Sequence, residues 1–91
     1  MHEMSIALEI CRIAEERVGR DHLANVRAVG LEVGKEAGVD PESLRFCLEV
    51  LLSQPPFRQA TPDILLRPSD TLKVTYLIVD DGEPAAAEAR P

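Results

Sequence analysis

The chain has 91 residues, 45% of them hydrophobic and 29% charged, which fits one small globular domain and excludes two-domain enzymes and large nucleotide-binding folds. Sixteen acidic and ten basic side chains give a net charge of -6, and no segment concentrates Lys or Arg, so a nucleic-acid-binding protein is not expected. No apolar run reaches the roughly 18 residues of a membrane-spanning helix. The first residues lack the pattern of a signal peptide, and we therefore expect a cytoplasmic protein.

Residues 4–18 repeat apolar side chains at helical spacing and predict an amphipathic helix. Its main stripe consists of Met4, Ala7, Leu8, Cys11, Ala14 and Val18, widened by Ile6, Ile10 and Ile13. So wide an apolar surface predicts that the helix packs on a sheet and also touches a second element. Gly19 is the expected stop, because glycine readily adopts the left-handed backbone that follows helix ends.

Residues 25–33 alternate between apolar and other side chains, with Val29, Leu31 and Val33 on one face, and predict a half-buried strand. Asp40 followed by Pro41 predicts the start of a second helix, because Asp caps free amides and Pro suits the first helical position. The expected inner stripe of this helix is Leu44, Cys47, Leu48 and Leu51, with Phe46, Val50 and Leu52 as flanking cover. Two prolines at 55–56 end it.

Residues 64–66 and 72–79 are rich in aliphatic and β-branched side chains and predict two further strands. The polar turn at 68–70 joins them, and we expect them to pair as a hairpin. Residues 81–91 contain no aromatic or β-branched side chain and are expected to form a disordered tail after a domain that ends at residue 80.

The order helix, strand, helix, strand, strand predicts an α/β (α+β) fold in which two helices pack on one face of a small three-stranded sheet. The sequence leaves the oligomeric state open, because the exposed edge of such a sheet is either covered by a second chain or simply short. An enzyme is not expected, since no nucleophile with a nearby base and no cofactor-binding motif is present. Cys11 and Cys47 form no CxxC pair, and no structural zinc is expected.

Met1, His2 and Glu3 place an amine, an imidazole, two backbone amides and a carboxylate within three residues. Ni(II) and Cu(II) favour square-planar nitrogen coordination, and neighbouring amine, amide and imidazole nitrogens can supply it without a folded cavity. Taken alone, a histidine at position 2 is more often an exposed side chain of a chain end. The other histidine, His22, is expected in a surface loop.

The opening MHEMSIALEICRIAEE resembles the HypA/HybF family of hydrogenase nickel-incorporation proteins, and ANVRAVGLEVGKEAGVDPESLRFCLEVL continues the similarity to residue 52. TPDILLRP and TLKVTYLIVDD resemble the remaining two strands of the family more loosely. The resemblance implies that Met1, His2 and Glu3 bind Ni(II), and that the chain is a metallochaperone and no catalyst. It also implies that nickel passes to the large subunit of [NiFe]-hydrogenase, or in some organisms to urease, together with a nickel-handling GTPase.

The family also carries a zinc domain with two CxxC pairs between the second and third strands. Here a short turn at 67–71 takes its place, and neither Cys11 nor Cys47 can substitute for the missing ligands. Two hypotheses follow from the resemblance. The chain is either a nickel chaperone without the zinc domain, or an interaction or scaffold subunit of hydrogenase maturation that does not bind metal.

Overall fold

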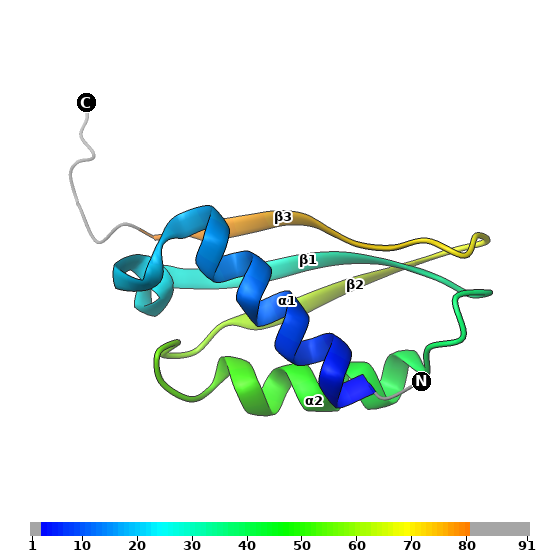
Figure 1. The fold of residues 1–91 in the computed structure, drawn as a ribbon, viewed down its shortest axis with the longest axis horizontal. Helices are drawn as coiled ribbons and strands as arrows, with labels where there is room; N and C mark the ends of the chain where they lie inside the picture. The colour runs from blue at the N-terminus through cyan, green and yellow to red at the C-terminus, as the bar shows by residue number, and fades with distance from the viewer. Residues whose placement is uncertain (1–2, 81–91) are drawn as a thin grey trace.

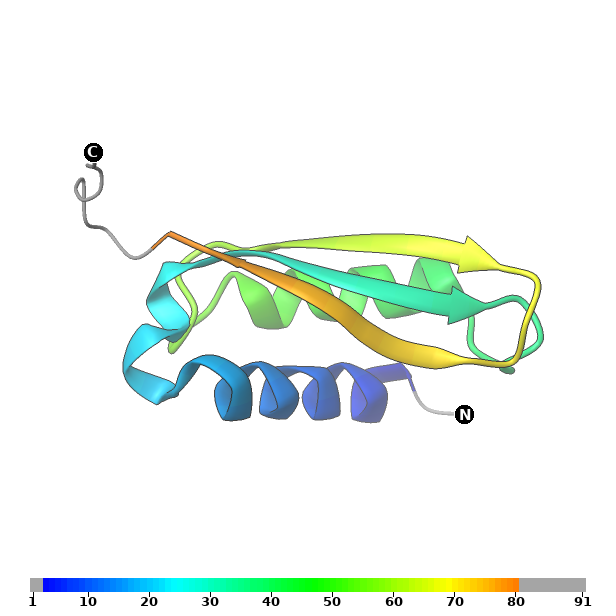
Figure 2. The ribbon, with the colours of Figure 1, turned by 90° about the horizontal axis from the view of Figure 1, so that it is seen from above.

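Two helices cover one face of a three-stranded sheet, as the sequence predicts (Figures 1 and 2). A computed structural model describes residues 3–80, so the predicted disorder of 81–91 concerns residues outside the described part and stays a prediction. The elements in chain order are α1 (Glu3–Val18), the 3-10 helix η1 (Arg20–Asn25), β1 (Val26–Gly34), α2 (Pro41–Leu52), β2 (Thr61–Arg67) and β3 (Leu72–Val79). No helix within residues 3–80 is both long enough and apolar enough to cross a membrane.

The strands do not form the predicted hairpin. The sheet order is β2-β1-β3, so β1 lies between the two strands that the sequence suggested as partners. β1 pairs in parallel with β2 and antiparallel with β3. The prediction was wrong because it rested only on the short turn between β2 and β3. This turn does not join neighbouring strands but crosses the end of β1 (Figure 2).

The crossing is held by backbone hydrogen bonds around Gly34, the last residue of β1. The Gly34 amide donates to the carbonyl of Thr71 at 2.6 Å, and the Glu36 amide donates to the carbonyl of Ser69 at 2.9 Å. A Cβ on Gly34 would lie 2.1 Å from the Ser69 carbonyl oxygen. Only glycine therefore allows the connection to pass this close to the strand.

The core forms between the helices and the inner face of β1. Val29, Leu31 and Val33 are fully buried, which confirms the predicted alternation of that strand. From α2 the core takes Leu44, Leu48 and Leu52. Each such aliphatic side chain contributes on the order of 1.5–3 kcal/mol when it is withdrawn from water.

The buried stripe of α1 differs from the predicted one. Ala7, Ile10 and Ala14 are buried, whereas Met4 is 41% and Leu8 54% exposed. α1 packs against α2 as well as over the sheet, so its buried side is shifted relative to the predicted stripe and Met4 and Leu8 lie outside it. The same kind of error affects α2, where Phe46 was expected to give flanking cover but is 65% exposed.

Gly19 ends α1 as predicted. Its backbone has a φ of 86°, which residues other than glycine rarely adopt. The 3-10 turn that follows was not predicted. Its one buried side chain, Leu23, closes the end of the core. A single apolar residue of this size in six gives no periodicity from which such a turn can be recognised.

On the face of the sheet without helices, Tyr76 of β3 lies across the central strand. Its ring occupies the place where a side chain of Gly30 would be, since a Cβ there would lie 2.2 Å from the ring. Its hydroxyl donates a hydrogen bond to the carboxylate of Asp63 on β2. This hydrogen bond raises the pKa of Tyr76. One side chain thus links both outer strands over β1.

We expect Gly34→Ala to lower the free energy of unfolding by about 3 kcal/mol, because the added methyl group meets backbone that cannot move without breaking hydrogen bonds. Urea denaturation measures the loss. Gly38→Ala is the control. Gly38 has a φ of 78°, but a methyl group added there would have no neighbouring atom within 4 Å. This substitution should therefore lower the free energy of unfolding by only about 1–2 kcal/mol, because of the backbone conformation alone. An equal or smaller loss at Gly34 would contradict the crossing geometry.

Gly30→Ala should lower the free energy of unfolding by about 2 kcal/mol in the natural chain, because the methyl group displaces the Tyr76 ring. In a Tyr76→Ala background most of that loss should disappear. The coupling energy in this double-mutant cycle is expected to exceed about 1 kcal/mol. Additive losses would show that Tyr76 does not cover Gly30.

Candidate metal centre

Of the three predicted nickel ligands, the structure places Glu3. It is the first residue of α1, and Met1 and His2 lie outside the described residues. The first four N–H groups of a helix have no acceptor within the helix. The amide of Glu3 is therefore not used by the hydrogen bonds of α1.

The side chain of Glu3 joins the start of α1 to the start of α2. Its Oε2 accepts a hydrogen bond from the backbone N–H of Asp40 at 3.0 Å. This hydrogen bond lowers the pKa of the Glu3 carboxyl, and a second one from the N–H of Glu3 itself lowers it further by a smaller amount. The carboxylate is thus held as an anion at the point where the tripeptide enters the fold.

Asp40 has two roles at this point. Its Oδ1 accepts from the Glu42 amide at 3.0 Å and its Oδ2 from the Ser43 hydroxyl at 3.1 Å, which confirms the predicted helix cap. Its backbone binds Glu3 at the same time. Two carboxylates therefore lie at the base of the tripeptide.

The loop that carries Asp40 is itself anchored to the crossing connection. The Lys35 amide donates to the carbonyl of Arg67 at 2.7 Å, and the Ala37 amide donates to that of Gly34 at 3.0 Å. The first half of the loop that leads from β1 to Asp40 is therefore held at the end of the sheet.

The sequence predicted Asp40 as a cap but did not predict its contact with Glu3. The two residues are 37 positions apart, and they meet only because the helices start at the same end of the sheet. No local pattern carries that information. The only hint of this contact in the sequence is that both helices have an acidic residue in their first turn, where the helix dipole favours negative charge.

His22, Cys11 and Cys47 lie away from this end. His22 is exposed on η1, which follows the far end of α1. The 16 residues of α1 span about 24 Å. Cys11 and Cys47 are free and half-buried in the helices, and burial raises the pKa of the Cys11 thiol. Within residues 3–80, His, Cys, Asp and Glu side chains nowhere gather in a group of three able to hold a metal ion.

Comparison with known proteins identifies the family. A family model described as hydrogenase/urease nickel incorporation, metallochaperone, hypA matches residues 1–84. The chain belongs to this family. The match includes β2 and β3, for which the resemblance in the sequence was loosest.

Several curated relatives are each named hydrogenase maturation factor HypA. The protein from Albidiferax ferrireducens is 35% identical over 68 residues, which cover 75% of this chain and 60% of that protein. The protein from Desulfatibacillum aliphaticivorans is 42% identical over 65 residues, covering 70% and 50%. The protein from Azotobacter chroococcum is 49% identical over 51 residues, covering 56% and 45%. The chain thus spans about half the length of the relatives it matches.

In the metal-free protein, the charge of Glu3 should stabilise the fold at neutral pH. A carboxyl whose pKa is lowered by folding stabilises the protein above its ordinary pKa of 4.5, and this contribution is lost as the pH falls through the lowered value. We therefore expect Glu3→Gln to be less stable than the natural chain near pH 7, and the difference to vanish in acid. Urea denaturation at a series of pH values measures it.

Glu49→Gln is the matched control, because Glu49 is an exposed residue of α2 away from this contact. A stability difference at Glu3 that is independent of pH, or one that Glu49→Gln reproduces, would contradict the assignment.

Proposed function

We propose that this chain is a nickel metallochaperone that binds Ni(II) through Met1, His2 and Glu3 and supplies it for [NiFe]-hydrogenase maturation. The observation that carries the proposal is the sequence Met-His-Glu at the start of a chain whose residues 1–84 match the nickel-incorporation family. The role is that of a carrier and not of an enzyme.

The chemistry of binding follows from the covalent order of the ligands. The terminal amine, the following amide nitrogens and the imidazole of His2 are adjacent along the chain, so they can close small chelate rings in one plane around Ni(II). The hydrogen bond between the Glu3 carboxylate and the Asp40 amide supports this arrangement, because it holds the third residue of the proposed ligand set at the start of α1. A net charge of -6 further favours the approach of a divalent cation.

Such a site suits transfer. Its ligands come from one end of the chain, so the receiving protein can approach the metal without opening a core. Binding releases protons from the amine and amides and requires neutral imidazole, and the affinity is therefore linked to pH. Under the proposal, a nickel-handling GTPase and the hydrogenase large subunit are the partners in this transfer.

We expect untagged protein with a free amino end to bind Ni(II) with the absorption band of diamagnetic square-planar nickel. His2→Ala or acetylation of the amino end should weaken binding at least about tenfold, because each removes a nitrogen ligand. Affinity should also fall as the pH drops below the usual histidine pKa of about 6.5. Spectroscopic titration measures all three effects.

His22→Ala is the matched control and should bind nickel like the natural chain, since His22 lies beyond the opposite end of α1. If acetylated protein or His2→Ala binds nickel unchanged, the proposed ligand set is wrong.

A test in cells separates carriage from scaffolding. Under our proposal, His2→Ala lowers hydrogenase activity and added nickel restores it. Undiminished activity and partner binding with His2→Ala would instead favour the scaffold hypothesis.

A further inference from the structure

The two cysteines of the chain lie on different helices, Cys11 on α1 and Cys47 on α2. Both are free and half-buried, and both pack against the hydrophobic core. The nickel site proposed above uses neither of them. A half-buried thiol is still open to solvent in part, so the places of these two thiols on the helices decide which reactions they can undergo.

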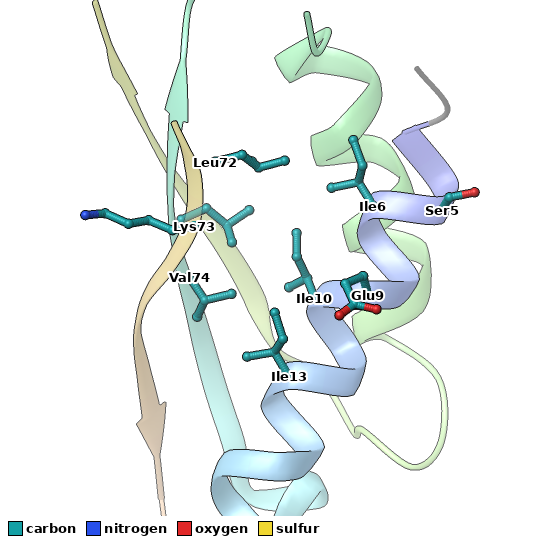
Figure 3. Close-up of a pocket in the computed structure, with 9 residues that line it drawn as sticks. Ser5, Ile6, Glu9, Ile10, Ile13, Leu72, Lys73 and Val74 are labelled. Atoms are coloured by element: carbon teal, nitrogen blue, oxygen red, sulfur yellow. The ribbon is translucent and has the colours of Figure 1, made fainter. Parts of the chain in front are cut away.

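Cys11 lies on the flank of α1 that faces away from β3. The opposite flank points toward β3 across an apolar groove and consists of Ile6, Ile10 and Ile13 (Figure 3). Two residues along a helix turn the chain by about 200°, so the side chain of Cys11 points almost opposite to that of Ile13. α2 contacts β2, the strand at the other edge of the sheet, and therefore lies on the Cys11 side of α1.

Cys47 lies on the flank of α2 that faces α1. The two helices run in the same general direction over the same face of the sheet, so corresponding flanks point the same way (Figures 1 and 2). Cys47 follows the fully buried Leu44 by three residues, just as Ile10 follows the fully buried Ala7. Ile10 points from α1 toward β3. Cys47 correspondingly points from α2 toward α1.

The two cysteines are also nearly level along the helix pair. The hydrogen bond between the Glu3 carboxylate and the Asp40 amide sets the starts of α1 and α2 side by side. Cys11 is eight residues beyond Glu3, and Cys47 is seven residues beyond Asp40. At the usual helical rise these separations are about 12 Å and about 10.5 Å. The facing flanks of the two helices thus carry the thiols at the same level.

We propose that Cys11 and Cys47 are a redox modification site, at which a disulfide bond joins α1 to α2. The oxidant is a small disulfide of the glutathione type. The thiolate of one cysteine attacks this disulfide, forms a mixed disulfide and releases a first small thiol. The thiolate of the other cysteine then attacks the protein sulfur of the mixed disulfide and releases a second small thiol. The protein loses two electrons and two protons, which the small disulfide takes up in becoming two thiols.

This bond acts as a reversible clamp on the helix pair. The segment between the two cysteines contains η1 and the whole of β1. Closing so long a segment restricts the unfolded chain and stabilises the folded one. In the folded chain the clamp ties together the two helices whose starts meet at Glu3 and Asp40.

Incubation of the full chain with glutathione disulfide under native conditions tests the proposal. We expect a product without bonds between chains, lighter by two hydrogen atoms, whose digest contains one pair of peptides joined through Cys11 and Cys47. At equal urea concentration the oxidised protein should have an unfolded fraction at least about tenfold lower than the reduced protein. Dithiothreitol should abolish this difference.

Cys11→Ala combined with Ile13→Cys is the matched control, because it keeps two thiols but moves one of them to the groove side of α1. This variant should take up one glutathione on each thiol and form no bond within the chain. A control that joins its two thiols as readily as the natural chain would overturn the proposal. Natural protein that stays reduced, keeps a glutathione on each cysteine, forms bonds only between chains, or joins Cys11 to Cys47 only in urea would overturn it as well.

Discussion

The fold depends on the double pairing of β1. This strand binds β2 on one side and β3 on the other, and its inner side chains Val29, Leu31 and Val33 are the floor on which both helices pack. A strand bonded along both edges and buried on one face has only one acceptable register, since a shift by one residue would turn its apolar side chains toward water. The positions of the edge strands and helices follow from that register.

The same strand is connected to the place where Glu3, the third residue of the proposed nickel site, lies. β1 ends at Gly34, the following loop is bonded to the crossing connection, and Asp40 at the end of that loop holds Glu3. The covalent order of the tripeptide determines which atoms can chelate nickel, and the fold determines where its third residue is held. These two contributions are separable, because a planar nitrogen site needs no cavity to form.

The elements were largely predictable from the sequence, because each has a local cause. Asp40 and Pro41 start α2, Gly19 stops α1, and the alternation of β1 reports one buried face. The features that the sequence did not predict depend on residues distant in the chain. The pairing of β2 and β3 with β1, the outward orientation of Phe46 and Leu8, and the contact of Glu3 with Asp40 all arise only when the elements assemble. For the candidate site, the proposed ligand types follow from three adjacent residues, whereas the hydrogen bond between Glu3 and Asp40 could not be predicted from the sequence.

The crossing at Gly34 has a consequence for how this architecture tolerates change. The backbones of β2 and β3 each pair with β1 and not with one another, so the segment that joins them closes no backbone ladder between these two strands. Additional residues that leave the hydrogen bonds from Gly34 and Glu36 to this segment intact would cost chiefly loop-closure entropy, about 0.6 kcal/mol for each doubling of loop length. The junction between these two strands is therefore a position at which a chain of this type can accept or omit an entire module while the sheet stays intact.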